Sequence, residues 1–188
     1  MAFAPSCRGL GASKQNSSLP FSIFAFSSFP FHSALHYLVS NLLIRTAIPS
    51  EQQLLESLQL RAGLANLGDR DALLAHPDAI AIPPHQIAAG RVFVAQSGDA
   101  IVGFAALELR PDGDTELDGL FVDPASQRRG IGRALVQHCA AFARSRRSAA
   151  LHVIGNPHAQ HFYTSCGFLP SGTAQTRFGP ALLFRLSL

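Results

Sequence analysis

Short apolar runs bounded by polar and turn residues recur along this chain, which predicts buried β-strands. The clearest pair is 91–96 and 100–109, because Ser97, Gly98 and Asp99 between them favour a hairpin turn. Further strands are expected at 42–47, 115–122, 151–154, 168–174 and 181–186. Strands therefore recur along most of the chain after residue 41.

Other segments repeat their apolar residues at helical spacing. The strongest runs from Gly130 to about Ser145, with an expected buried face of Ile131, Ala134, Leu135, His138 and Phe142. Ser50 is expected to cap a helix that reaches about Leu60, and a short helix is expected at 69–75. Residues 76–90 contain three prolines and are expected to form a loop.

The first forty residues differ from the rest, with no acidic residue, nine serines and six of the 14 phenylalanines. Arg8 and Lys14 precede an apolar stretch, as in a signal peptide, but serine and proline interrupt that stretch and exclude a membrane span. A transit peptide would contain more arginine. We interpret 1–41 as a poorly ordered leader or a start placed upstream of the true one, and leave a targeting segment open. The domain then spans 42–188.

Charge and cysteine content exclude some functions. The net charge is +3, and from residue 44 onward thirteen arginines face twelve acidic residues. A nucleic-acid surface needs a denser basic face, so no nucleic-acid partner is expected. Cys7, Cys139 and Cys166 form no Cys-x-x-Cys pair, which argues against a disulfide framework or a zinc site. This cysteine pattern favours a reducing cytoplasm. No membrane association is expected, because the apolar stretch near the N-terminus is too broken for a membrane span.

Residues 117–135 predict an anion site. A buried strand ends at Asp123-Pro124, and a loop rich in arginine and glycine leads into the long helix. Backbone amides at a helix start have no partner inside the helix, and the helix dipole places partial positive charge there. Gly130 and Gly132 lack a Cβ, so a ligand can approach the backbone. Such a site suits a phosphate or pyrophosphate.

Two common phosphate loops do not fit this segment. A Walker loop needs Gly-Lys-Ser/Thr, and the chain's only lysine is Lys14. A dinucleotide fingerprint needs a third glycine at the position of Leu135. The spacing Gln127-x-x-Gly130-x-Gly132 after a strand instead resembles the acetyl-CoA loop of the GNAT superfamily of N-acetyltransferases.

A second segment strengthens the resemblance. Leu151–Ile154 is a predicted strand, Asn156 is a good N-cap before Pro157, and Phe162-Tyr163 lies on the apolar face of a short helix that Gly167 ends. GNAT enzymes have the same order of strand, asparagine, short helix with Phe-Tyr, and Gly-Phe opening another strand. The two motifs occur in the order and at the separation of that superfamily.

The resemblance implies an α/β fold with a mixed, mostly antiparallel sheet of six to seven strands and helices on both faces. It also implies that the strand at 117–122 splays from the strand at 151–154, and that the pantetheine of acetyl-CoA lies in the gap. Carried over residue by residue, the cofactor-binding positions are Leu120, Phe121, Val122, Gln127, Arg128, Arg129, Gly130, Ile131, Gly132, Arg133, Ala134 and Asn156.

Acetyl transfer needs an acid for the leaving thiolate, and the resemblance assigns this role to Tyr163. A phenol has a pKa near ~10, close to that of a thiol, so the proton transfer is feasible. Glu116 matches the position of the base in histone-acetylating members, and Asp118 shares its strand face. The alternative for Tyr163 is a core aromatic residue without a catalytic role. The alternative for Glu116 and Asp118 is a solvated acidic hairpin, in which case water would act as the base.

No metal site is expected. The acidic run from Asp112 has Leu117 where a calcium loop needs glycine, and His158 with His161 lacks a third ligand.

The sequence thus predicts an acetyl-CoA-dependent N-acetyltransferase, monomeric or homodimeric, acting by direct transfer on a primary amine of a small molecule or protein. The alternative is a non-catalytic GNAT-fold module that binds acyl-CoA as a sensor or interaction partner.

Overall fold

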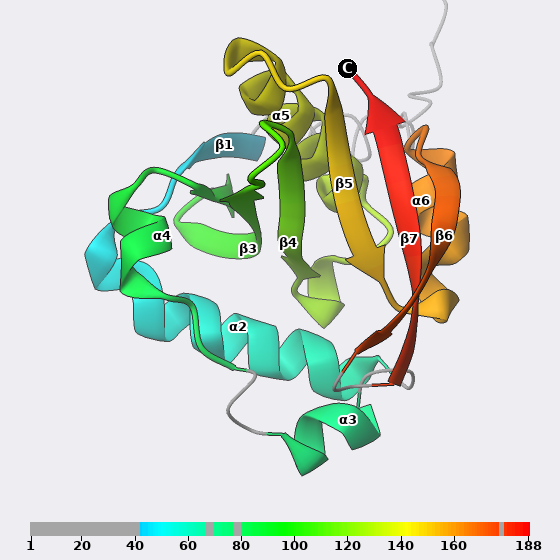
Figure 1. The fold of residues 1–188 in the computed structure, drawn as a ribbon. Coiled ribbons are helices and arrows are strands. Elements are labelled where there is room, and N and C mark those ends of the chain that lie inside the picture. The colour runs from blue at the N-terminus through cyan, green and yellow to red at the C-terminus, as the bar shows by residue number, and fades with distance from the viewer. Residues whose placement is uncertain (1–41, 67–69, 77–79, 177–178) are drawn as a thin grey trace, which may run out of the picture. The chain divides into compact units, whose positions relative to one another are not determined.

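One mixed β-sheet organises the part of the chain that the computed structural model describes, residues 42–66, 70–76, 80–176 and 179–188 (Figure 1). Its seven strands follow the order β1-β2-β3-β4-β5-β7-β6. They are β1 (Leu42–Thr46), β2 (Val92–Ser97), β3 (Ala100–Leu109), β4 (Thr115–Val122), β5 (Ala150–Gly155), β6 (Leu169–Thr176) and β7 (Gly179–Ser187). Neighbouring strands are antiparallel except β4 and β5, which confirms the predicted mixed, mostly antiparallel sheet.

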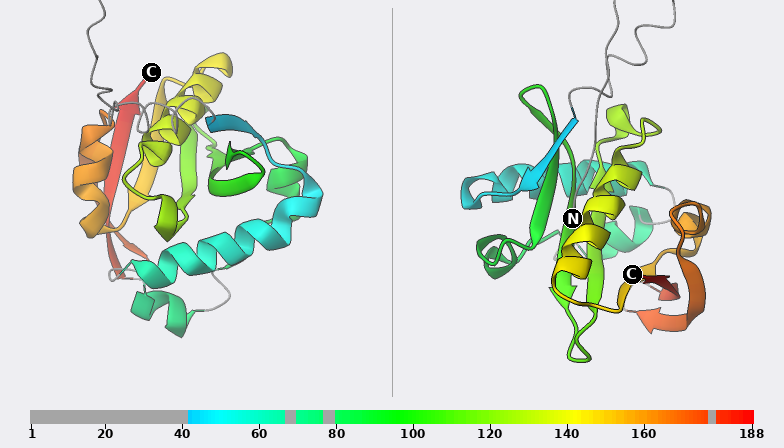
Figure 2. Two further views of the ribbon diagram at one scale, coloured as in Figure 1. Left: turned by 180° about the vertical axis from the view of Figure 1, so that it is seen from behind. Right: turned by 90° about the horizontal axis from the view of Figure 1, so that it is seen from above.

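Helices cover both faces of the sheet, as predicted. The helices are α2 (Gln52–Ala65), α3 (Arg70–Ala75), α4 (Pro84–Ala88), α5 (Ile131–Ser145) and α6 (Gln160–Ser165). Buried residues of α2 and α4 pack on one face, and those of α5 and α6 on the other. Figure 1 shows α2 crossing near the end of β4, with α5 behind the strands, and the reversed view in Figure 2 shows α5 in front of them.

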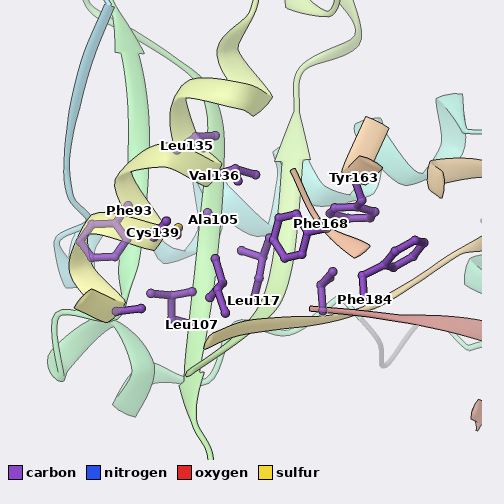
Figure 3. Packing of buried hydrophobic residues seen from close by; sticks show 14 of the residues in the cluster. Phe93, Ala105, Leu107, Leu117, Leu135, Val136, Cys139, Tyr163, Phe168 and Phe184 are labelled. Atoms are coloured by element: carbon purple, nitrogen blue, oxygen red, sulfur yellow. The ribbon is translucent and has the colours of Figure 1, made fainter. Parts of the chain in front are cut away.

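Two apolar clusters hold these layers together, because successive residues of β2 and β3 point to opposite faces. On the α5 side, Phe93 and Leu107 pack against Leu135 and Cys139 (Figure 3). On the α2 side, Phe104 packs with the leucines of α2. Burial raises the pKa of the Cys139 thiol to about 12, so Cys139 is a core residue, as interpreted from the sequence.

Several predicted boundaries are wrong. Ser50 does not cap a helix, because a 3-10 turn at Pro49–Glu51 precedes α2, and the Glu51 carboxylate accepts the N–H of Ile48 at 2.9 Å. Helix α2 extends to Ala65 rather than ending near Leu60, and Ala62 in its last turns packs in the core. Residues 76–90 are not only a loop, because Pro84 at a first helical position opens α4, while 77–79 lie outside the described residues. Of the predicted buried face of α5, Ile131 and Leu135 are buried, whereas Ala134, His138 and Phe142 are only half-buried. The buried residues of α5 are instead completed by Val136, Cys139, Ala140 and Ala143.

β4 is irregular where the strands part. Ala106 pairs with Gly119 and Leu107 with Leu117, so Asp118 is an extra residue at a bulge. Towards β5, the described pairing covers only Thr115–Leu117 opposite Leu151–Val153. Both strands continue beyond this point, β4 to Val122 and β5 to Gly155. The predicted splay is therefore present, and it begins at the bulge.

Candidate active site

The loop between β4 and α5 leaves backbone amides available. Asp123 accepts the N–H of Ala125 at 3.1 Å and so caps the short 3-10 turn at Pro124–Ser126. Arg128 and Gly130 have positive φ values of 60° and 80°. Gly130 is the N-cap of α5, and no side chain caps this helix. The first-turn amides of a 15-residue helix thus point out of the loop, which fits an anionic ligand.

The two glycines of this loop have different surroundings. A Cβ on Gly130 would meet no atom within 4 Å, so open space lies beside it. A Cβ on Gly132 would lie 3.2 Å from the ring of Phe162 and 3.7 Å from Val122. From the sequence alone, both glycines are expected to allow close approach of a ligand. At Gly132 the structure adds a packing reason, because α5 and α6 touch there.

Positive charge surrounds the start of α5. Arg128, Arg129 and Arg133 are exposed, and Arg133 Nη2 donates to Ser165 Oγ on α6 at 3.2 Å. On the other side of the loop, Arg61 of α2 pairs with Asp123 at 2.9 Å. This hydrogen bond holds the pKa of Asp123 below its usual range, and the pair ties α2 to the end of β4.

The remaining predicted cofactor positions contribute mainly backbone. Leu120 and Val122 pack towards α5, whereas Phe121 packs on Phe104 with ring centroids 5.1 Å apart. Ile131 is buried and Ala134 half-buried. Gln127 Nε2 donates to the carbonyl of Val122 at 3.5 Å, and Asn156 accepts the N–H of His158 at 2.9 Å. Asn156 is thus confirmed as an N-cap, here of a 3-10 turn that leads into α6.

Tyr163 lies in an aromatic cluster on the α5 side of the sheet (Figure 3). Its ring is 5.2 Å from that of Phe162, 5.6 Å from that of Phe168 and 5.4 Å from that of Phe184, centroid to centroid. Gly155, at the end of β5, leaves room for the ring, because a Cβ there would lie 2.9 Å from Tyr163 Cε2. The side chain is thereby fixed beside the end of β5, with 8% of the residue exposed.

The two candidate bases have different partners. Glu116 Oε2 accepts from Arg110 Nη1 at 3.0 Å, an ion pair. Asp118 Oδ2 accepts instead from the amide of Gln86 at 3.1 Å. Glu116 pairs with Glu108 across β3 and β4, which places their side chains on one face, opposite the α5 core.

Sequence reasoning missed Gln86. It is 2% exposed, and its Nε2 also donates to Glu108 Oε1 at 2.5 Å. Arg91 pairs with the other oxygen of Glu108. Partial burial raises the pKa of Glu108, but the bonds from Gln86 and Arg91 and the charge of Arg91 outweigh it and lower the pKa. No local signal marks Gln86, because its partners are 22 and 32 residues away in the chain.

Asp114 is structural rather than part of a solvated hairpin. It accepts the N–H groups of Ala149 and Ala150 at 2.8 and 3.0 Å, and His152 Nε2 lies 2.9 Å from its Oδ2. The hydrogen bond to His152 is the main reason why the pKa of Asp114 lies below its usual range, and the two backbone bonds add to it. Asp114 therefore joins the start of β4 to the start of β5.

We expect Asp114→Ala to lower the free energy of unfolding by about 1.5–3 kcal/mol at neutral pH, because two backbone donors lose a charged acceptor. The folded-state pKa of Asp114 is depressed. Its stabilisation is therefore complete above the unfolded-state pKa and is lost as pH falls through the folded-state pKa. Urea unfolding of both proteins from pH 7 to pH 3 should show the difference shrinking below about pH 4. A constant difference would contradict this account.

Within the described ranges no group of three His, Cys, Asp or Glu residues could hold a metal ion, and His158 and His161 are exposed. None of the helices in those ranges is long and apolar enough to cross a membrane.

Three solved structures share the fold of this chain at low sequence identity. The PaiA N-acetyltransferase of Thermoplasma acidophilum in complex with coenzyme A has a TM-score of 0.65 and 14% identity, covering 78% of this chain and 99% of its own. Ard1 of Thermoplasma volcanium scores 0.61 at 16% identity, covering 79% and 98%. YncA, a putative acetyltransferase of Salmonella typhimurium with acetyl-CoA, scores 0.60 at 22%, covering 79% and 94%.

The sequence comparisons give one clear match. No curated protein sequence is significantly similar to this chain. Residues 62–168, more than half of the 188, match the family described as acetyltransferase (GNAT). This range includes the loop before α5 and the helix that carries Tyr163. The chain belongs to the acetyltransferase (GNAT) family.

Proposed function

We propose that this chain transfers the acetyl group of acetyl-CoA directly to a primary amine of a small molecule or protein. The observation that carries the proposal is the position of the uncapped start of α5 at the end of β4, beside the separation of β4 from β5. Pyrophosphate would bind the loop amides, with Gln127 to Arg133 around it. Pantetheine would bond to the backbone of 120–122, which has no β5 partner among the described pairs.

The residues present fit such a ligand. Open space beside Gly130 leaves the loop backbone accessible, and the exposed arginines supply charge opposite to that of the phosphates. Ile131 and Ala134 belong to the same first turn of α5. Asn156 lies at the start of the turn after β5, where we propose that it contacts the cofactor.

In the proposed reaction, the amine nitrogen forms a bond to the thioester carbonyl carbon and the carbon–sulfur bond breaks. Tyr163 gives its proton to the departing thiolate, which leaves as the thiol of CoA. The amine proton passes to Glu116, Asp118 or water, and solvent restores the phenol. Tyr163 suits the acid role because aromatic packing fixes its ring beside the end of β5.

Acetyl-CoA turnover against a panel of monoamines, diamines, amino acids and lysine peptides tests this function. Release of free CoA that depends on an added amine would support it. Binding of CoA by calorimetry without turnover on any amine would contradict it and favour the acyl-CoA-binding module.

We also propose that the domain spans 42–188, that it works in the cytoplasm as a monomer or homodimer, and that it needs neither metal nor nucleic acid. Cys139 and Cys166 are free, which suits a reducing compartment. Sedimentation of the purified protein would fix its oligomeric state.

A chain that begins at Asn41 should fold and bind CoA with the affinity of the full chain, within about twofold. The physical reason is that the seven strands and both apolar clusters of the described part arise from residues after 41. Thermal unfolding and calorimetry of the two chains check this. Insolubility or loss of CoA binding in the shorter chain would show that residues 1–41 support the domain.

A further inference from the structure

Five carboxylates lie on β3, on β4 or in the turn between them, and they differ in what holds them. Glu108 pairs with Arg91, Asp112 and Glu116 pair with Arg110, and Asp114 pairs with His152. Asp118 differs, because the hydrogen bond described for its carboxylate comes from the neutral amide of Gln86. Of these five carboxylates, Asp118 is therefore the one that has neither an arginine nor a histidine partner among the described residues.

Asp118 also occupies a special place in the fold. It is the extra residue of the β4 bulge, and the pairing of β4 with β5 ends one residue before it. A bulge re-aims its side chain relative to a regular strand. The Asp118 carboxylate is thus exposed at the point where the two strands part, next to the backbone that we propose binds pantetheine.

The side-chain amide of Gln86 holds the Asp118 carboxylate in place. Its side chain is buried, and one amide nitrogen donates to both Glu108 and Asp118, at 2.5 and 3.1 Å. Two carboxylates held close together repel each other, and a shared donor offsets that repulsion. Arg91 forms an ion pair with the other carboxylate oxygen of Glu108. The backbone N–H of Arg91 donates to the carbonyl of Gln86 at 3.0 Å. The amide therefore has a fixed position.

We propose that Gln86 is a positioning residue for the acceptor. It holds Asp118 at the bulge with one carboxylate oxygen hydrogen-bonded, which leaves the other oxygen to receive the amino group of a cationic acceptor. The inference rests on the proposed function. It makes α4 part of the acceptor site and favours Asp118 over Glu116, whose carboxylate already forms an ion pair with Arg110.

A double-mutant cycle tests this relation, using the best acceptor from the amine panel. Asp118→Asn should lower kcat/KM for the acceptor at least tenfold, because a charge-assisted hydrogen bond is lost. Gln86→Met, which keeps the length of the side chain, should lower it about tenfold. The double variant should be no worse than Asp118→Asn within about twofold, because Gln86 acts through Asp118. The KM for acetyl-CoA should not change.

Two further variants separate positioning from stability. Gln86→Asn keeps an amide but is too short to reach both carboxylates, so it should lower kcat/KM in the same direction even if Gln86→Met folds poorly. Gln96 is the matched control, because its amide also makes two hydrogen bonds, with Arg45 at 2.9 Å and Gly98 at 2.8 Å, on the β2–β3 hairpin. Gln96→Met should leave acceptor kinetics unchanged.

The outcomes distinguish this inference from the proposed function. Wild-type protein that binds CoA but acetylates no amine overturns the function, and the inference with it. Wild-type turnover with effects of Gln86→Met and Asp118→Asn that multiply in the double variant overturns the inference alone. Unchanged acceptor kinetics in Gln86→Asn would also overturn the inference and leave the proposed function standing.

Discussion

Tyr163→Phe should lower kcat by about 10²-fold or more, the usual contribution of a general acid. The substitution keeps the ring, which packs among Phe162, Phe168 and Phe184, and removes only the hydroxyl group. The KM for acetyl-CoA should therefore change little. The measurement is steady-state kinetics with the best acceptor, with a pre-steady-state experiment to show that chemistry limits the rate.

A control in the same aromatic cluster separates chemistry from packing. Phe184→Leu removes a ring 5.4 Å from Tyr163 but keeps the phenol, so kcat should fall only a few-fold while stability decreases. If Phe184→Leu lowers kcat as much as Tyr163→Phe, packing explains the effect. An undiminished kcat in Tyr163→Phe would mean that water protonates the thiolate and that the tyrosine serves the core.

Gly130→Val should weaken CoA binding by tenfold or more, which corresponds to about 1.4 kcal/mol. The new side chain would enter open space beside the start of α5, where we propose that pyrophosphate binds. Gly130 also has a φ of 80°, so the substitution strains the backbone whether or not a ligand binds. Calorimetry with CoA measures the affinity.

Gly113 provides the matched control for this strain. Its φ is 89°, and a Cβ there would also meet no atom within 4 Å, but it lies in the β3–β4 turn. Gly113→Val should lower the unfolding temperature by a similar amount and leave CoA affinity intact. Equal CoA affinity in the two variants would rule out the loop assignment.

Local sequence patterns predict the cofactor half of the proposed site. The β4–α5 loop and the Asn156 cap are specified by residues close together in the chain, so turn, capping and helix-start chemistry predict them directly. The hairpin of β2 and β3 and the strand positions followed, for the same reason, from short apolar runs and the turn residues between them. The catalytic roles of Tyr163, Glu116 and Asp118 came from the family resemblance, because neither residue spacing nor composition indicates them.

The acceptor half of the proposed site depends on contacts between segments that are distant in the chain. Helix α4 lies in a proline-rich segment without helical periodicity, and packing on the sheet forms it. The hydrogen bonds of Gln86 and the ion pair of Arg61 with Asp123, 62 residues apart, join distant segments. The β4 bulge depends on its register with β3. No local pattern encodes these contacts. The packing of the helices on the sheet decides which carboxylates form ion pairs and which remain free to bind a ligand.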